Sequence, residues 1–354
     1  MNNIYDAAIV GAGPAGAFFA RELAMLCPDL SVILIDGQSE ENKKPCGGLL
    51  APDAQRILAE LDLTLPKNIL SDPQIFSVET IDLTAKCVRY YQRHYLNMDR
   101  FAFDKWLISL VPDSVTKIGA RVRDIKQEGG HYTLSLSAFD STTHSILAKA
   151  VIGADGGGSI VRRKLIGRTL PQYVSIQEWY ENKGQRLPYY SCIFDKATSE
   201  SCSWTIHKDA YAMFGGAFEK QGCREAFETQ KLRLEAFLGS KFGKVIKREA
   251  CLVTSPRRFK DFCIGKPSVY LLGEAAGFIS ASSFEGISSA ILSAKLLAEA
   301  FGESGAHEKI ARLYKRKTLK LRLKLFTKIF KRWVLCTPIL RYAIMKSGIQ
   351  SIKK

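Results

Sequence analysis

The feature that most constrains the fold of this chain is a glycine-rich turn close to its start. An apolar stretch from Ile4 to Val10 leads into Gly11-Ala12-Gly13-Pro14-Ala15-Gly16, and a run rich in Ala and Leu continues to Leu26. A second apolar stretch, Val32 to Ile35, ends in Asp36. This order predicts a strand, a tight turn, a helix and a second strand, the Rossmann-type βαβ unit.

Each glycine of the turn has a definable task. Gly11 permits the tight turn, Gly13 lets the backbone approach a pyrophosphate, and Gly16 lets the helix pack closely on the strand. Asp36 follows Gly16 by 20 residues, where its carboxylate can accept hydrogen bonds from ribose hydroxyls. An ordinary glycine-rich turn is the alternative, but the flanking elements and the acid favour a nucleotide site. The pattern alone does not separate NAD from FAD.

Charge is distributed unevenly along the 354 residues. From residue 308 onward there are 15 Lys and Arg residues and one acid, so this segment carries +14 of the net +16. Residues 1–307 are nearly neutral, at +2. A near-neutral body with a basic appendage argues against nucleic acid as the partner of the body.

The nine cysteines are scattered, and no two of them have C-x-x-C spacing. We therefore expect neither a metal site nor a framework of disulfides. The start of the chain lacks a basic region followed by an apolar one, and no apolar run is long enough to cross a bilayer. These features predict a cytoplasmic protein.

Two later segments point to FAD. Residues 151–156, which include Asp155, resemble the "GADG" segment of the flavoprotein hydroxylase superfamily. Residues 272–278 resemble that superfamily's "GDAAG" segment, whose acid contacts the FAD ribityl chain, although this chain has Glu274 where Asp is usual. The resemblance also implies that Gly286 and Ile287, at the start of the next helix, face the flavin ring.

The resemblance implies an α/β protein with the hydroxylase-like FAD-binding fold, in which a three-layer Rossmann-type domain carries an inserted antiparallel substrate sheet. We expect the FAD-binding domain to comprise residues 1–73, 98–170 and 255–305. The substrate domain then comprises residues 74–97 and 171–254, and basic amphipathic helices occupy residues 306–354.

A Lys44-Pro45-Cys46-Gly47-Gly48-Leu49 segment narrows the family. It resembles the geranylgeranyl reductases, which saturate isoprenoid double bonds with FAD, and Asp99 to Leu107 matches their "DR…FD…L" helix. Longer segments such as KPCGGLLAPDAQR and GEAAGFISASS resemble, over the full length, a family associated with colicin M tolerance whose reaction is not settled. The cofactor-binding residues expected are Gly11, Gly13, Ala15, Gly16, Asp36, Lys44, Cys46, Gly47, Arg100, Val122, Asp155, Gly273, Glu274, Gly286 and Ile287.

The substrate side is less well defined. The reductases line their lipid cavity with a Tyr-x-Trp-x-Phe-Pro element; Trp204 matches its tryptophan, and the other three key positions differ. We also assign His207, Phe214 and Gly215 to this side, although a core histidine and a bend in a sheet are the plainer interpretations. Cys46 is the candidate catalytic proton donor, and a packing role in a tight turn is favoured over it.

The basic tail has a helical pattern with two interpretations. At about 100° per residue, five lysines fall within one arc of about 80°: Lys317, Lys320, Lys324, Lys328 and Lys331. Five apolar residues fall on the opposite side: Leu319, Leu323, Phe326, Phe330 and Trp333. Such a helix suits an anionic membrane surface, and it equally suits packing of its apolar face on the body of the protein.

The resemblance to the geranylgeranyl reductases implies an FAD-dependent oxidoreductase that reduces carbon–carbon double bonds of a polyprenyl lipid by hydride transfer. No second G-x-G-x-x-G with strand and helix context is present, so NAD(P)H or another reductant would act as a transient electron donor. A flavin monooxygenase acting on an apolar substrate and a non-catalytic lipid-binding flavoprotein are the alternatives. A peripheral location on the inner face of the cytoplasmic membrane would agree with a lipid substrate.

Overall fold

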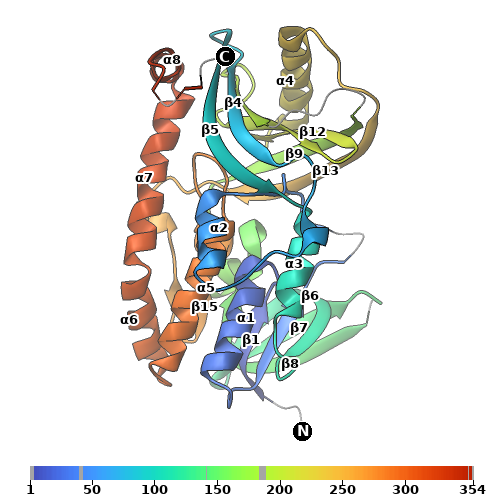
Figure 1. Ribbon diagram of the computed structural model, residues 1–354. Coiled ribbons are helices and arrows are strands. Elements are labelled where there is room, and N and C mark those ends of the chain that lie inside the picture. The colour runs from blue at the N-terminus through green and yellow to red at the C-terminus, as the bar shows by residue number, and fades with distance from the viewer. Residues whose placement is uncertain (1–3, 40–42, 141, 183–188, 350, 353–354) are drawn as a thin grey trace.

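The structure, a computed structural model, describes residues 4–39, 43–140, 142–182, 189–349 and 351–352. Two β-sheets lie one above the other in the view of Figure 1, and three C-terminal helices run along one side of both. The first sheet holds the βαβ unit near the start of the chain, and the second sheet holds most of the strands between residues 75 and 254.

The predicted βαβ unit is confirmed. Strand β1 (Ile4–Val10) is followed by helix α1 (Pro14–Leu26) and strand β2 (Val32–Asp36). β1 pairs in parallel with β2 on one edge and with β8 (Thr143–Gly153) on the other. Val32 to Ile35 are at most 2% exposed, which is typical of a parallel strand covered on both faces.

The rest of the first sheet extends this parallel core. It consists of β6 (Thr116–Glu128), β7 (His131–Ala138), β14 (Gly265–Lys266) and β15 (Val269–Leu271). β6 and β15 pair in parallel with β2 and β8, while β7 joins β6 to β8 through antiparallel pairs. The parallel order is therefore β6-β2-β1-β8-β15, and the carboxyl ends of these strands meet at one edge, where α/β folds bind their ligands.

Two helices secure this edge. α3 (Arg100–Ser109) begins where the sequence predicts, because the Asp99 carboxylate accepts a hydrogen bond from the amide of Ala102 at 2.8 Å. α5 (Ile287–Gly302) packs beside α1 (Figure 1). The rings of Phe19 and Phe301 are in edge-to-face contact at 5.8 Å. Both helices contribute to one hydrophobic core with the first sheet.

The second sheet is antiparallel except for one pair, β4 with β10. Its order is β13 (Val245–Thr254), β9 (Gln172–Glu181), β12 (Tyr211–Phe218), β11 (Cys202–Lys208), β10 (Tyr189–Phe194), β4 (Ile75–Asp82), β5 (Cys87–Asn97) and β3 (Leu49–Leu50). Helix α4 (Cys223–Leu238) covers one face through Phe227 and Leu234, which leaves the other face toward the first sheet.

Short elements complete the connections. They are α2 (Pro52–Ala59), η1 (Lys67–Ile69), η2 (Gly156–Gly158), the π-helical turn η3 (Arg162–Ile166), η4 (Phe259–Asp261) and η5 (Gly273–Ala276). η2 and η5 lie at the carboxyl ends of β8 and β15, so the two glycine-rich segments singled out from the sequence come to the same edge of the sheet.

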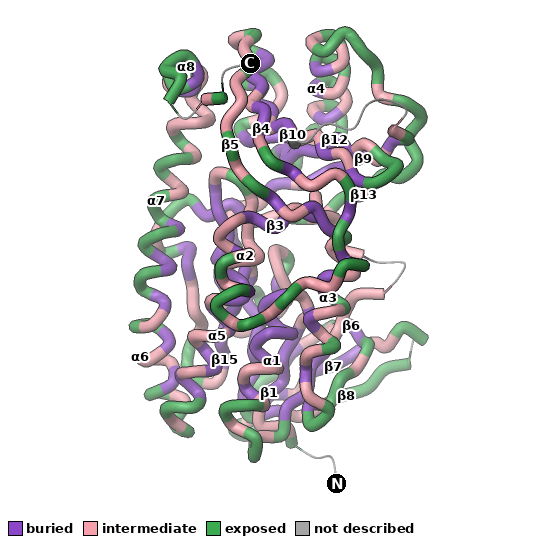
Figure 2. The backbone as a smooth tube through the Cα atoms, viewed as in Figure 1, coloured by how far each residue is buried: buried purple, intermediate pink, exposed green. Residues whose placement is uncertain are grey.

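The C-terminal segment forms α6 (His307–Lys317), α7 (Leu319–Cys336) and α8 (Pro338–Lys346). α6 belongs to the main core: Ile310 and Tyr314 are buried, and the Tyr314 hydroxyl donates to the carbonyl of Leu271 at 3.0 Å. α7 continues from α6 alongside the second sheet, and much of its surface is exposed (Figure 2). Within the described ranges, none of the helices combines the length and apolar character needed to cross a bilayer.

Candidate functional site

A cavity of about 920 Å³ lies between the two sheets, within the range of cofactor and ligand pockets. It extends from the carboxyl ends of β1 and β2 to the inner face of the second sheet. Of the fifteen cofactor residues predicted from the sequence, all except Gly16 and Gly273 line this cavity. Segments distant in sequence therefore meet around one space.

Gly16 and Gly273 serve packing beside the cavity. A Cβ atom at Gly16 would lie 1.8 Å from the carbonyl oxygen of Gly11, so α1 could not sit this close to the turn. Gly273 has a φ of +50°, and a Cβ there would lie 3.2 Å from the Cβ of Ala15. The task predicted for Gly16, close packing of helix and strand, is confirmed.

Gly13 is different, because a Cβ atom at this position would meet no described atom within 4 Å. Its φ of −68° suits any residue, so neither backbone strain nor a clash explains the glycine. It lines the cavity directly before α1, whose first turn has no acidic residue and no side-chain cap. The open space beside these helix-terminal amides fits a pyrophosphate.

Asp36 lies at the end of β2 on the cavity wall. One carboxylate oxygen accepts from the amide of Gln38 at 3.0 Å, and the other pairs with Lys105 Nζ at 3.1 Å. Since a carboxylate has about four acceptor positions, two remain for ribose hydroxyls.

Glu274 contacts protein groups through both of its oxygens. Oε2 lies 2.7 Å from Lys44 Nζ, and Oε1 accepts from the amide of Thr254 at 2.8 Å. The negative charge of Glu274 raises the pKa of Lys44. The additional methylene of Glu, relative to the usual Asp, thus carries the acid to a lysine from the Pro-Cys-Gly-Gly segment.

Asp155 combines a structural contact with an unused acceptor. Its Oδ2 accepts from the amides of Ile160 and Val161 at 2.6 and 3.3 Å, which shapes the turn after β8. Its Oδ1 is buried without a hydrogen-bond partner among the described residues, and burial raises the pKa of this carboxyl. Asp155 lines the cavity, so its unpaired Oδ1 is suited to a hydrogen bond with a polar cofactor group.

The Pro-Cys-Gly-Gly segment is held from two sides. Cys46 Sγ accepts from the amide of Gly48 at 3.4 Å and lies 3.6 Å from Nη1 of Arg100, whose Nε pairs with Asp104 at 2.8 Å. Behind the segment, the ammonium group of buried Lys208 donates to the carbonyls of Gly48 and Met98. Cys46 therefore has a defined packing role in the turn, while it also lines the cavity.

On the substrate side the structure separates the four predicted residues. Trp204 lines the cavity, and Gly215 lies directly beneath it: a Cβ at Gly215 would come within 2.6 Å of the indole nitrogen. Gly215, Phe214 and His207, also assigned to the substrate side, do not themselves line the cavity. Because side chains alternate along a strand, Phe214 points to the opposite face and packs on Phe227.

His207 lies at an odd offset from Trp204 on the same strand, so it too points away from the cavity. Its backbone carbonyl accepts from Asn97 at 2.8 Å, and burial lowers the pKa of its imidazole. The plainer interpretation of a core histidine fits this position.

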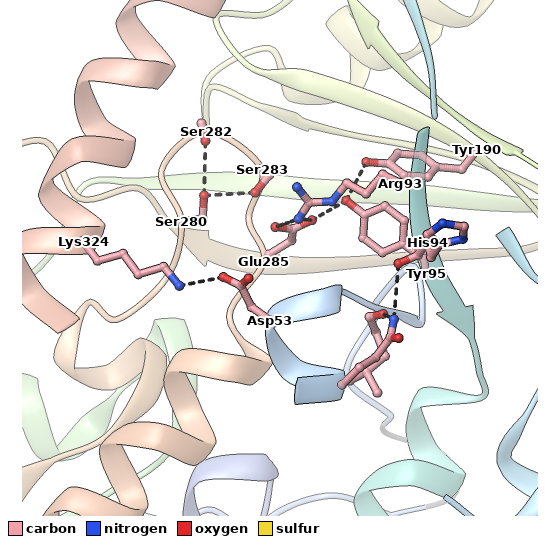
Figure 3. A network of polar contacts seen from close by, with 12 residues as sticks. Asp53, Arg93, His94, Tyr95, Tyr190, Ser280, Ser282, Ser283, Glu285 and Lys324 are labelled. Carbon is pink, nitrogen blue, oxygen red and sulfur yellow. Dashed lines mark hydrogen bonds and ion pairs between the residues drawn. The ribbon is translucent and has the colours of Figure 1, made fainter. Parts of the chain in front are cut away.

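Sequence reasoning missed a polar cluster at the far end of the cavity, drawn in Figure 3. The hydroxyl of Tyr95 donates to Glu285 at 2.6 Å, and Arg93 pairs with the other oxygen of Glu285 at 3.2 Å. Tyr190 approaches the Tyr95 hydroxyl at 3.4 Å, and both rings line the cavity. The only signal in the sequence was the position of Glu285 directly before Gly286.

Within this cluster, the phenol proton of Tyr95 is hard to remove. Burial, reinforced by the charge of Glu285, raises the pKa of Tyr95 above the range of phenols in water. Tyr95 is only 4% exposed. It therefore stays protonated at neutral pH, and its one proton is donated to Glu285 beside an apolar space.

No family model matches the chain. It is similar over nearly its full length to curated proteins named CbrA. It is 45% identical to Protein CbrA of Escherichia coli O6:H1, which covers 98% of this chain and 94% of that protein. It is also 45% identical to Protein CbrA of Shigella dysenteriae serotype 1, covering 98% of each.

Solved structures share the fold at low identity. A geranylgeranyl bacteriochlorophyll reductase-like protein of Thermoplasma acidophilum is 18% identical, with a TM-score of 0.78, covering 95% of this chain and 88% of that one. The flavin-dependent brominase Bmp2 is 17% identical, with a TM-score of 0.70, covering 97% and 93%. The p-nitrophenol 4-monooxygenase PnpA of Pseudomonas putida is 17% identical, with a TM-score of 0.69, covering 98% and 94%. The hydroxylase-like FAD-binding fold expected from the sequence is confirmed.

Proposed function

The chain belongs to the CbrA family, and we propose that it is an FAD-dependent oxidoreductase that reduces carbon–carbon double bonds of a polyprenyl lipid. The observation that carries the proposal is a single cavity with two kinds of wall. One end has a glycine turn and charged groups suited to a dinucleotide, and the other end has aromatic and aliphatic side chains beside the Tyr95–Glu285 cluster.

The dinucleotide end supports FAD through the chemistry of its residues. Gly13 and the first amides of α1 would hold the pyrophosphate, Asp36 the ribose, and Arg100 the phosphates or the ribityl chain. Glu274 would reach the ribityl chain while it remains paired with Lys44. Bound FAD would supply hydride transfer, which no side chain of the protein can perform.

The other end supports a long apolar substrate. Its aliphatic and aromatic lining includes Trp204, Ile206, Ile279 and Phe284. An isolated alkene has no polar group to bind, so these residues must orient it by shape and exclude water. The polyprenyl class itself is taken from the resemblance to the geranylgeranyl reductases and from the printed name of the Thermoplasma protein.

Saturation of an alkene also needs a proton, and two sources line the cavity. The thiol of Cys46 lies in the turn beside Arg100, and the phenol of Tyr95 lies beside Glu285. Because the pKa of Tyr95 is raised by burial, its own acidity is low, which leaves Cys46 as the candidate catalytic acid. NAD(P)H or another reductant would deliver electrons from outside, as expected from the sequence.

The test has two stages. The purified protein is first examined for the visible absorption of bound flavin, with FAD supplied if needed; protein that stays colourless contradicts the proposal. The protein is then reduced without oxygen and mixed with prenyl lipids of different lengths. Reoxidation of the flavin together with a product heavier by two hydrogen atoms supports the reductase.

Two other outcomes would replace the proposal. Oxygen consumption with an oxygenated product identifies a monooxygenase. Tight lipid binding without reoxidation of the flavin by any lipid identifies a non-catalytic lipid-binding flavoprotein.

A further inference from the structure

Helix α7 packs on the protein through a face that neither interpretation of its sequence pattern anticipated. The buried residues of this helix are Leu321, Arg322 and Leu325. At about 100° per residue they lie between the lysine arc and the apolar arc. The apolar arc is therefore mostly turned away from the body, although Phe326 meets Phe259 edge to face at 5.7 Å.

The apolar arc forms an exposed stripe on α7. Its members are Leu319 at 46% exposure, Leu323 at 51%, Phe326 at 44%, Phe330 at 66% and Trp333 at 57%. At 1.5 Å per residue the stripe is about 21 Å long. Apolar exposure continues on α8, where Ile339 is 80% exposed. A continuous stripe of large apolar residues, in contrast to single ones, marks an interaction surface.

The other flank of the helix is basic. Lys320, Lys328 and Lys331 form no ion pair with any residue in the described ranges, and Lys324 pairs only with the half-exposed Asp53 at 2.7 Å. Residues 308–354 carry a net +14. The lysines thus border the stripe on one helix: Lys320, Lys324 and Lys331 are exposed, and Lys328 is half-buried.

We propose that α7 docks on the surface of an anionic lipid bilayer, with its axis in the plane of the interface. The stripe would enter the acyl boundary, and the neighbouring lysines would reach the anionic headgroups. Charge selects this occupant over a second copy of the chain, since pairing through α7 would bring two segments of +14 together.

The docking surface lies next to the candidate site. Lys324 contacts Asp53 on α2, and the adjacent residue on α2, Ala54, lines the cavity. Docking would therefore bring the protein's cavity close to a membrane lipid. The proposal itself concerns binding alone and does not rest on the redox activity.

The test uses the full-length protein and lipid vesicles sedimented with it. Vesicles of phosphatidylcholine alone are compared with vesicles that also contain phosphatidylglycerol, at low and high salt. We expect binding that needs the anionic lipid and falls with salt. Lys320→Gln with Lys328→Gln should weaken it by about fivefold for each lysine. Phe330→Ser with Trp333→Ser should weaken it by at least about tenfold.

Matched controls lie on distant elements. Leu232→Ser, on α4 at 63% exposure, and Lys241→Gln, exposed after α4, should leave vesicle binding unchanged. Every variant should keep the thermal unfolding temperature of the parent, which excludes misfolding as the cause of a loss. Equal binding to neutral and anionic vesicles, or full binding by both double variants, would overturn the proposal. A dimer in solution that Phe330→Ser with Trp333→Ser dissociates would also overturn it, because the stripe would then be a contact between copies.

Discussion

Lys44 Nζ and Glu274 Oε2 lie 2.7 Å apart, although 230 residues separate them in the sequence. Their contact joins the Pro-Cys-Gly-Gly segment to the turn after β15, across the carboxyl edge of the first sheet. Gly156 and Gly157 leave room for it: a Cβ at Gly157 would come within 2.7 Å of Glu274 Oε1. Three sequence segments thus converge on one ion pair.

We expect this pair to be energetically coupled. Glu274→Gln leaves the Lys44 ammonium in the cavity wall without its anion. Lys44→Met leaves the Glu274 carboxylate without its cation. Lys44 is about one third exposed, so each change should cost only about 1–2 kcal/mol of unfolding free energy. In a double-mutant cycle the double variant should lose less than the sum of the single ones. Strictly additive losses would contradict the coupling.

The pair should also persist at high pH. Glu274 raises the pKa of Lys44 above its ordinary 10.5, so the stabilisation is fully present below pH 10.5. It is lost only as the pH rises through the higher pKa of the folded state. The stability difference between the parent and Lys44→Met should therefore be constant from neutral pH to about pH 10. A difference that shrinks already near neutral pH would exclude this ion pair as its source.

Substitution by alanine should affect FAD binding at Gly13 and folding stability at Gly16. Gly13→Ala adds a methyl group to open space, so the protein should fold normally and lose affinity for FAD by about tenfold or more. Gly16→Ala forces a methyl group against the carbonyl of Gly11 and should lower the melting temperature by several degrees. Flavin titration and thermal unfolding measure the two effects. Unimpaired FAD binding by Gly13→Ala would contradict the pyrophosphate assignment.

Local sequence signals predicted most of the dinucleotide end. The turn from Gly11 to Gly16 has conformational demands that few other structures meet, and the Asp99 cap fixes the start of α3 by a contact three residues away. Signals of this kind depend on neighbours along the chain. Resemblance then placed the remaining segments, and thirteen of fifteen predicted residues line the cavity.

The substrate end could not be predicted in the same way, because it depends on contacts between distant segments. Phe214 was assigned to the substrate side, but it packs on Phe227 at the opposite face of β12, and no local signal in the sequence tells the two faces apart. The contact of Tyr95 with Glu285 joins residues 190 positions apart. For α7, the hydrophobic pattern identified two faces, while the packing face centres on Leu325, between them.

Lys208 should make stability depend on alkaline pH. Burial lowers the pKa of this ammonium from 10.5 to about 8, while its attraction to Cys46, Asp99 and Asp209 partly opposes the shift. Between about pH 8 and 10.5 the folded protein releases a proton that the unfolded chain keeps. Stability contributed by Lys208 should therefore rise across this window, by at most about 3 kcal/mol.

The measurement compares the parent with Lys208→Met, using urea unfolding at neutral pH and at about pH 10. The parent should gain more stability, or lose less, than the variant, because only the parent carries the buried ammonium. Other alkaline titrations are common to both proteins and cancel in the difference. Identical pH profiles would show that Lys208 keeps an ordinary pKa in the folded state.

Helix α8 should depend on a buried ion pair. Arg341 Nε lies 2.6 Å from Asp82 Oδ2, and their side chains are 3% and 0% exposed. Asp82 also accepts from the amides of Thr84 and Ala85, which shapes the turn after β4. Arg341→Met leaves this carboxylate buried without its cation and should reduce the free energy of unfolding by about 3 kcal/mol.

Asp82→Asn removes the negative charge of this pair and keeps the size of the side chain, so it distinguishes the effect of charge from that of packing. The double variant Arg341→Met with Asp82→Asn should recover part of the loss, since no charge is then left buried. Arg312→Met, at an exposed arginine on α6, serves as the matched control and should change stability by less than about 0.5 kcal/mol. If Arg341→Met were as stable as this control, the ion pair would not be what fastens α8 to the second sheet.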